Sequence, residues 1–342
     1  MNNKLGTCCQ ILDDNGKQYK NTIIGTVQQS ALDKLIAQGR FADHKVVTTN
    51  PPQRTLVLET DKAAFKRCHD KVTSKVKQNL NALYEQLQHV SKMPSDCHMF
   101  RISSNLLPMF DHPQYKMLYN DYLLSIVKAG LARCKKLIDK HNIIVTCHPD
   151  QYNIINSDKD HVRANSFRTL EYHRYFMEQL TTFDQSCINV HVTGKLDHSP
   201  ELDRGEYPEL CKWLSIENDD TNTNAGVLAT LEFCDKYNLK MVYDIHHDYC
   251  ENLGNLVADD DRIMASVITT WNSQTPIFHV SDSRDSVPVE EYMPRRLSPH
   301  SDYIDCDKAI QRTKGLLEFA HVEVEAKAKN NAVSRLYCDL SN

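Results

Sequence analysis

The chain has 342 residues and a formal net charge of −5; 41% of its residues are hydrophobic and 25% are charged, which excludes a disordered chain. No apolar run approaches the roughly 20 residues that a membrane-spanning helix needs, and the first ten residues lack the apolar stretch of a secretory signal. We therefore expect a soluble intracellular protein, of cytoplasm or nucleus, whose twelve cysteines stay reduced, since none forms a CxxC pair. The negative charge counts against a strongly basic nucleic-acid-binding protein, although bound cations would reverse its sign locally.

Short β-type runs alternate with longer helical patterns along the chain. The eight runs lie at residues 5–11, 98–103, 142–148, 187–192, 213–217, 240–245, 276–281 and 321–326. Segments between them, such as 119–142 and 222–238, carry apolar residues at helical spacing. This alternation predicts a parallel sheet, and eight strands over this length predict a single (β/α)₈ TIM barrel that spans residues 1–342.

Two segments fit the alternating pattern poorly. Residues 12–60 are polar and irregular around one expected helix at 26–39, and we interpret them as an elaboration at the edge of the first βα unit. Residues 281–305 follow the seventh strand and contain three prolines. Loops of this length inside a compact domain are usually functional or disordered.

Residues of metal-ligand type stand at the ends of most of the predicted strands. They are His148, His191, Glu217, Asp244 with His247 three residues on, His279 and Glu325, and His300 falls in the long loop after the seventh strand. Taken singly, a histidine at a strand end is more often structural. In a barrel, however, the carboxyl ends of the strands form the active-site face, and so many ionisable groups together would be costly to bury without a cation. The set predicts a site for two or three divalent ions, with Mn²⁺ favoured and Zn²⁺ or Mg²⁺ as alternatives.

The same residues lie in segments that resemble the UV damage endonucleases, relatives of the endonuclease IV barrels. The matching segments run in order from about residue 76 to 335 and are FRISSNLLP, HPDQYNIINS, NVHVTGK, LSIENDD, VYDIHHD, FHVSDS, PHSDYI and VEAKAKNNAV. The resemblance implies the eight metal ligands named above. It also implies that Gln151 and Tyr152 probe the gap left when a damaged dinucleotide leaves the stack, and that the enzyme incises duplex DNA 5′ to pyrimidine dimers, leaving a 3′ hydroxyl.

Two positions depart from the family pattern. The family usually has a lysine, which can be carboxylated and bind metal, where this chain has Ile277. We therefore expect one metal site to be weaker, to be filled by water, or to use a neighbour such as Asp282 or Asp302. At the first strand, family members tend to have an aromatic residue near a glycine, whereas this chain has Gly6 followed by Thr7. This departure weakens the case for probing of the damage from that side.

The predicted chemistry is phosphodiester hydrolysis by clustered metal ions, which activate water and stabilise the transition state without a side-chain general base. We expect Glu217, Glu325 and His191 to be central to catalysis, with both glutamates as central or bridging ligands. Basic residues near the strand ends are candidates for contacts with DNA phosphates, namely Lys195, Lys327, Arg295 and Arg296. The expected partner is damaged double-stranded DNA, abasic sites being a further candidate lesion, and nothing demands more than a monomer.

Two other functions stay open at this point. A xylose isomerase-like sugar isomerase or epimerase uses a similar barrel, but such enzymes generally have more carboxylates than imidazoles and have no use for a Gln-Tyr pair. A damage-binding protein without catalysis is the other, and Ile277 is its only hint in the sequence.

Overall fold

The computed structural model describes residues 3–38, 51–150, 152–194, 206–220, 224–284 and 291–341. Eight parallel strands form one sheet, in the order β6-β5-β4-β3-β2-β1-β8-β7. They are β1 (Leu5–Cys8), β2 (Met99–Ile102), β3 (Ile144–Cys147), β4 (Ile188–His191), β5 (Leu214–Glu217), β6 (Lys240–Val242), β7 (Ile277–Val280) and β8 (His321–Val324). Each of the eight predicted runs contains one of these strands.

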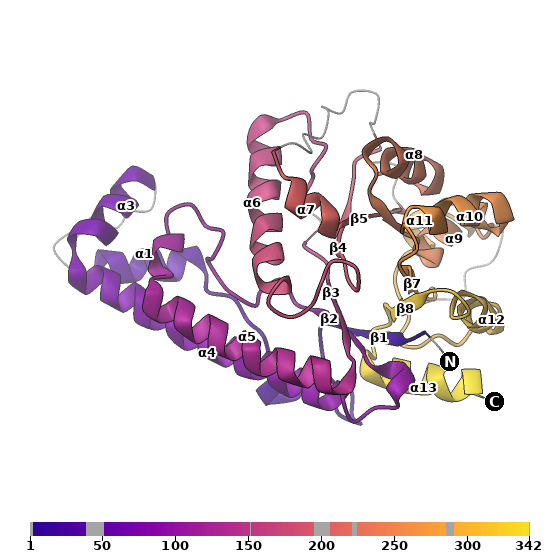
Figure 1. Ribbon diagram of the computed structural model, residues 1–342, viewed down its shortest axis with the longest axis horizontal. Coiled ribbons are helices and arrows are strands. Elements are labelled where there is room, and N and C mark those ends of the chain that lie inside the picture. Colours follow the sequence, from indigo (N-terminus) through magenta and orange to yellow (C-terminus); the bar gives the residue numbers. More distant parts are fainter. Residues whose placement is uncertain are drawn as a thin grey trace.

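The eight strands close into a barrel, because the outer strands of the sheet, β6 and β7, also meet. β1 pairs with both β2 and β8, so the first and last strands are neighbours. Between β6 and β7, an isolated parallel bridge joins Asp244 to His279, and the amide of His279 donates to the carbonyl of Tyr243 at 2.9 Å. The bridge lies at the carboxyl ends of the strands, and it completes the barrel around which the helices are arranged (Figure 1). The predicted (β/α)₈ fold is confirmed.

Helices connect consecutive strands, and local capping sets their ends. The side chain of Asn120 accepts from the amide of Leu123 at 3.0 Å at the start of α5, and Asn142 ends that helix in the left-handed conformation with φ 50°. The connecting helices of the barrel are α4 (Lys62–Val90), α5 (Asp121–His141), α6 (Asp160–Met177), α7 (Pro208–Trp213), α8 (Val227–Tyr237), α9 (Ile245–Glu251), α10 (Asp261–Thr269), α11 (Pro294–Leu297) and α12 (Asp307–Leu316), and α13 (Asn330–Ser341) follows the last strand. In the described residues, none of the helices is both long and apolar enough to cross a membrane.

The elaboration after β1 forms a helical layer on the outside of the barrel. Within residues 12–60 the structure has α1 (Gln29–Ala37) and α3 (Pro51–Thr60), which pack on α4 away from the strands (Figure 1). A buried ion pair joins them, since Nε of Arg54 lies 2.7 Å from Oδ1 of Asp33. The expected helix at 26–39 corresponds to α1, and α3 is an additional helix.

The barrel interior changes from apolar to polar along the strands. Its floor is an apolar cluster of Met99, Cys187, Val242, Trp271 and Ile277. Two residues further along the strands, the inward positions are occupied by Arg101, Asn189 and His279, because successive residues of a strand point to opposite faces. Ionisable groups therefore gather at the carboxyl ends, as the strand-end residues predict.

Candidate metal centre

The structure brings six of the eight predicted ligands together in two overlapping groups. One group is His148, His191 and Glu217, and the other is Glu217, Asp244, His279 and Glu325; in each, ligand atoms of all members lie within 4.8 Å of one another. Glu217, the last residue of β5, belongs to both groups. It is the geometric centre of the cluster.

Imidazoles surround the fully buried carboxylate of Glu217. Oε2 lies 3.1 Å from Nε2 of His148 and 3.8 Å from Nε2 of His191. Oε1 lies 3.1 Å from Nδ1 of His279 and 3.4 Å from Nδ1 of His247. Four histidines from four different strand ends thus converge on one carboxylate, with one oxygen facing each ligand group.

Asp244 and Glu325 complete the second group on either side of His279. Nδ1 of His279 lies 3.9 Å from Oδ2 of Asp244 and 3.4 Å from Oε1 of Glu325. Asp244 is also the N-cap of α9, and its Oδ1 accepts from the amide of His247 at 2.8 Å. The cap fixes the aspartate so that Oδ2 points into the cluster.

Backbone carbonyls fix the tautomer of three of the predicted ligands. Nδ1 of His148 donates to the carbonyl of Pro149 at 2.9 Å, and Nδ1 of His247 donates to that of Asn218 at 2.9 Å. Nδ1 of His300 donates to the carbonyl of Glu325 at 2.6 Å. A neutral imidazole that donates through Nδ1 presents a lone pair at Nε2, which is the form that binds a metal ion.

His300 reaches the cluster from the long loop after β7. Its ring centroid is 6.4 Å from that of His247 and 5.2 Å from that of His246. His247 and His300 are not members of the two compact groups, but both lie against them. All eight predicted ligands therefore occupy one face of the barrel.

The donor set fits divalent cations. Oε1 of Glu217 and Oδ2 of Asp244 are buried, and neither has a hydrogen-bond donor within the part of the chain that the structure describes. Buried carboxylate oxygens without donors are costly, whereas mixed imidazole and carboxylate ligands bind Mn²⁺ or Zn²⁺ well. The residues that would hold such ions are the two groups defined above.

In the protein without bound ions, protons on histidines partly balance the negative charges of the carboxylates. Burial by itself would raise the pKa of Glu217, but the imidazoles of His279 and His191 lower that pKa well below its usual range. Burial would lower the pKa of His247, but Asp244 and Glu217 raise it to about 10. Protons on imidazoles thus offset the carboxylates, and these are the protons that a metal ion would replace.

Several polar residues inside the barrel were not predicted from the sequence. Asn189 donates to Oε2 of Glu217, and Oδ2 of Asp219 lies 3.3 Å from Nδ1 of His191. Arg101 and Glu323 form a buried ion pair next to His279. The signal that could have found them is strand alternation, because Asn189 and Glu323 stand two residues before the ligands His191 and Glu325 and share their face.

The position where the family usually has lysine belongs to the barrel floor. Ile277 is 1% exposed and packs in the apolar floor cluster defined above. The suggested substitutes do not reach the ligand groups among the described residues: Asp302 is exposed, and the oxygens of Asp282 accept the amides of Ser283 at 2.9 Å and Cys306 at 3.0 Å. The expectation that one of them replaces the lysine is wrong, because backbone amides already hold Asp282.

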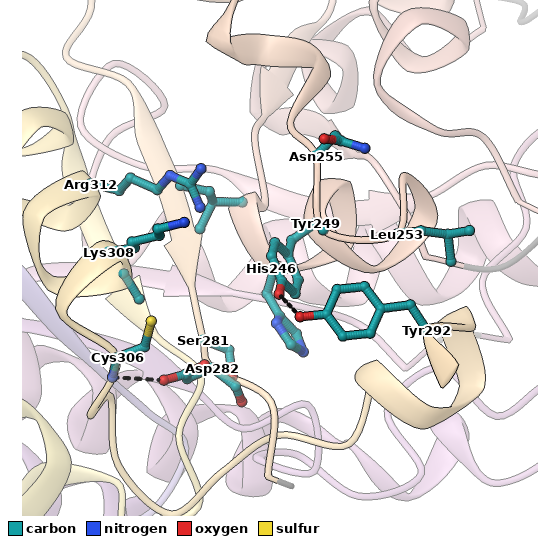
Figure 2. A pocket seen from close by; sticks show the side chains of 13 residues that line it. His246, Tyr249, Leu253, Asn255, Ser281, Asp282, Tyr292, Cys306, Lys308 and Arg312 are labelled. Atoms are coloured by element: carbon teal, nitrogen blue, oxygen red, sulfur yellow. Dashed lines mark hydrogen bonds between the residues drawn. The ribbon is translucent and has the colours of Figure 1, made fainter. Parts of the chain in front are cut away.

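A cavity of about 390 Å³ lies beside the cluster, between α9 and α12 (Figure 2). Asp282 and His246 line it, and the hydroxyls of Tyr249 and Tyr292 hydrogen-bond to each other at 3.0 Å on one side. His246 faces this cavity, whereas the next residue, His247, contacts Glu217. The first turns of α9 thus separate the cavity from the metal ligands.

The predicted DNA-contact residues lie at the surface where the structure describes them. Tyr152 is 80% exposed, directly after the loop that carries His148. Lys327 follows β8 and is exposed, and so are Arg295 and Arg296 on α11, which contacts α9. Gln151 and Lys195 lie outside the described residues.

Comparison with known proteins gives a consistent answer. Residues 42–342 match the model of the family described as UV-endonuclease UvdE. The UV DNA damage endonuclease of Bacillus mycoides (strain KBAB4) is 25% identical over 305 residues, covering 85% of this chain and 90% of the relative, and that of Bacillus anthracis is 23% identical over 305 residues with the same coverage. The crystal structure of SacUVDE is 20% identical, covers 99% of this chain and 98% of its own, and has a TM-score of 0.65, which supports the fold. The chain therefore belongs to the UV-endonuclease UvdE family.

Proposed function

We propose that this member of the UV-endonuclease family is a metal-dependent DNA-repair enzyme that hydrolyses the phosphodiester bond 5′ to pyrimidine dimers in duplex DNA, leaving a 3′ hydroxyl. The observation that carries the metal dependence is the position of Glu217, which is shared by two groups of ligand atoms. Membership of the family supports the DNA substrate. It also favours the nuclease over a sugar isomerase.

Two divalent ions, Mn²⁺ by preference, would be held by the two ligand groups, with Glu217 as the bridging ligand. His247 and His300 would complete the coordination or hold a third ion, because Nδ1 of each donates to a backbone carbonyl, which leaves Nε2 as the ligand atom. When bound, such ions activate water and neutralise the charge that develops on a phosphate. Oxygen and imidazole ligands suit Mn²⁺ and Zn²⁺, and Zn²⁺ is the alternative.

The chain's own residues would hold this arrangement. Glu217, Glu325 and His191 act as ligands rather than as general bases, since Glu217 is completely buried and has imidazoles on both oxygens. Asn189 donates to Glu217 and fixes the plane of its carboxylate. The catalytic role of these residues is therefore to place charge at the reacting phosphate.

DNA recognition would use the exposed residues on the same face. Tyr152, together with Gln151, would fill the gap left by an everted lesion, because an aromatic face replaces a lost stacking partner. Lys195, Lys327, Arg295 and Arg296 would contact phosphates and fix the register without reading sequence. Abasic sites are a second candidate lesion, since they too lack a stacked base.

The test is incision of end-labelled duplexes by the purified chain with Mn²⁺. Undamaged, UV-irradiated and abasic duplexes are compared, for the wild type and Glu217→Gln, with Asp33→Asn as a control that removes a buried carboxylate in the outer helical layer. We expect incision only of damaged duplexes, on the 5′ side, lost in Glu217→Gln and kept in the control. Cutting of undamaged duplex at the same rate, or turnover of ketoses without any nicking, would refute the proposal.

A further inference from the structure

Arg101 of β2 places a buried guanidinium against the second ligand group. Its Nε donates to Oε2 of Glu323 at 2.5 Å, and its Nη1 lies 2.5 Å from Oε1 of Glu325. Its Nη2 lies 2.9 Å from Nε2 of His279. Because a guanidinium is planar and always charged, these contacts fix the two carboxylates and the imidazole relative to one another.

Glu323 is 1% exposed and is a member of neither ligand group of the described residues. Its Oε1 accepts from the hydroxyl of Thr146, and its Oε2 lies 3.3 Å from Nε2 of His279 in addition to its bond with Arg101. Gly6 leaves the room that this side chain needs, since a Cβ there would lie 3.1 Å from Cγ of Glu323. Both oxygens of Glu323 are thus committed within the barrel.

The two nitrogens of His279 face different partners. Nδ1 faces the ligand oxygens of Glu217 at 3.1 Å and Glu325 at 3.4 Å, and Nε2 faces Oε2 of Glu323 at 3.3 Å. Nη2 of Arg101 lies 2.9 Å from Nε2 and 3.3 Å from Nδ1. An imidazole that binds a metal ion through one nitrogen carries a proton on the other, and a carboxylate that accepts this proton fixes the ring. With an ion on Nδ1 and a proton on Nε2, the acceptor within reach of Nε2 is Oε2 of Glu323. Nη2 of Arg101 can only donate, so in that state it would bond to Glu323 and no longer to the imidazole.

We infer that Glu323 and Arg101 are positioning residues of the metal centre: Glu323 accepts the Nε2 proton of His279 while Nδ1 binds the ion, and Arg101 holds Glu323 and Glu325 in the required orientation. The inference rests on the proposed function and adds a supporting layer to its second ligand group. Arg101 contacts no ligand of the first group in the described residues, so its effect is confined to one ion.

The test is a titration of the metal-free full-length chain with Mn²⁺, in which free Mn²⁺ is followed by electron paramagnetic resonance and bound metal by elemental analysis. The variants are Glu323→Gln and Arg101→Lys. Loss of such a supporting carboxylate weakens metal binding by about 10- to 100-fold. We expect the wild type to bind two ions and each variant to weaken one of them by that factor. Asp244→Asn, which removes a ligand of the second group, should shift the same phase.

A matched control separates positioning from general damage to the fold. Arg54→Lys changes a second buried arginine, also paired with a carboxylate, in the outer helical layer. It should lower thermal stability in EDTA without altering the Mn²⁺ titration. If Arg101→Lys does not fold, Thr146→Val is the variant that tests the inference. It removes only one hydrogen bond to Glu323 and should still weaken the binding of the same ion several-fold.

The outcomes distinguish this inference from the proposed function. Variants that fold and titrate like the wild type would overturn the inference, even when the wild type nicks damaged DNA. A wild type that binds two ions, loses one in the variants and nicks no duplex would support the inference and refute the proposed function. A wild type that binds no Mn²⁺ would overturn both.

Discussion

Substitution of Glu217 by glutamine should abolish most of the stabilisation that metal ions give to the fold. The reason is its position, since it supplies one ligand to each of the two groups. An ion present at 100 times its dissociation constant stabilises the folded chain by about 2.7 kcal/mol. With an unfolding entropy of roughly 2 cal/mol/K per residue, this raises the Tm of a 342-residue chain by about 4 °C per ion.

For two ions the wild type should therefore gain about 8 °C. If Glu217→Gln weakens each ion about 100-fold, the same Mn²⁺ concentration adds only about 0.4 kcal/mol per ion, and the total shift falls to about 1 °C. Asp244→Asn and His191→Gln each touch one group and should lose about half of the shift. The comparison of these three variants tests whether Glu217 bridges.

The assay is scanning calorimetry in EDTA and then in excess Mn²⁺, with Asp33→Asn as the control. Asp33 is a buried carboxylate that pairs with Arg54 away from the barrel strands, so its substitution should lower the Tm in EDTA and leave the Mn²⁺ shift intact. A Glu217→Gln variant that keeps the full shift would refute the assignment of Glu217 as a ligand. A variant that keeps half of the shift would refute the bridge alone.

Three further predictions concern DNA binding and pH. In a fluorescence anisotropy titration, Tyr152→Ala should weaken binding of UV-irradiated duplex by about 1–3 kcal/mol per base stack. Tyr152→Phe, which keeps the aromatic ring, should bind like the wild type. If Tyr152→Ala weakened the binding of undamaged duplex equally, a role in damage probing would be contradicted. Arg295→Ala and Arg296→Ala should each reduce the slope of log affinity against log salt by about 0.9, and an unchanged slope would exclude a phosphate contact. Burial lowers the pKa of His173 in the folded chain to about 4. As the pH falls, the unfolded chain therefore protonates this imidazole before the folded chain does. The stability that depends on a neutral His173 is present above pH 6.5 and is lost as the pH falls toward 4. Urea unfolding at pH 7.5 and 5.0 should therefore show His173→Phe losing about 2 kcal/mol less than the wild type, and parallel losses would contradict the assignment.

The strands and the positions of the candidate metal ligands could be predicted because both depend on local patterns. A run such as NIIVTCH has the apolar content of a strand buried on both faces, and the residue that follows the strand, His148, must then emerge at the active-site face. Every candidate ligand except His247 and His300 lies within one of the predicted strand runs, and His247 follows Asp244 by three residues. His300 follows from the family resemblance and from its place in the loop after β7.

The partners of the ligands could not be predicted, because they depend on contacts between distant strands. Arg101 and Glu323 are 222 residues apart in the chain, and an arginine within a strand is usually exposed. Only closure of the barrel, with β1 between β2 and β8, brings the two side chains together inside. The pair of Arg54 and Asp33 in the outer helical layer escaped prediction for the same reason.

The buried arginine also bears on how a chain with a net charge of −5 can act on DNA. Five carboxylates meet at the carboxyl ends of the strands, those of Glu217, Asp219, Asp244, Glu323 and Glu325. With the two proposed ions bound and the histidines neutral, the two ions and Arg101 together balance these five carboxylates. In the low dielectric of a buried site unbalanced carboxylates would act more strongly than exposed charges, which salt screens. The bound ions would therefore remove the repulsion that this cluster of carboxylates would otherwise exert on a phosphate, although the chain as a whole stays negative.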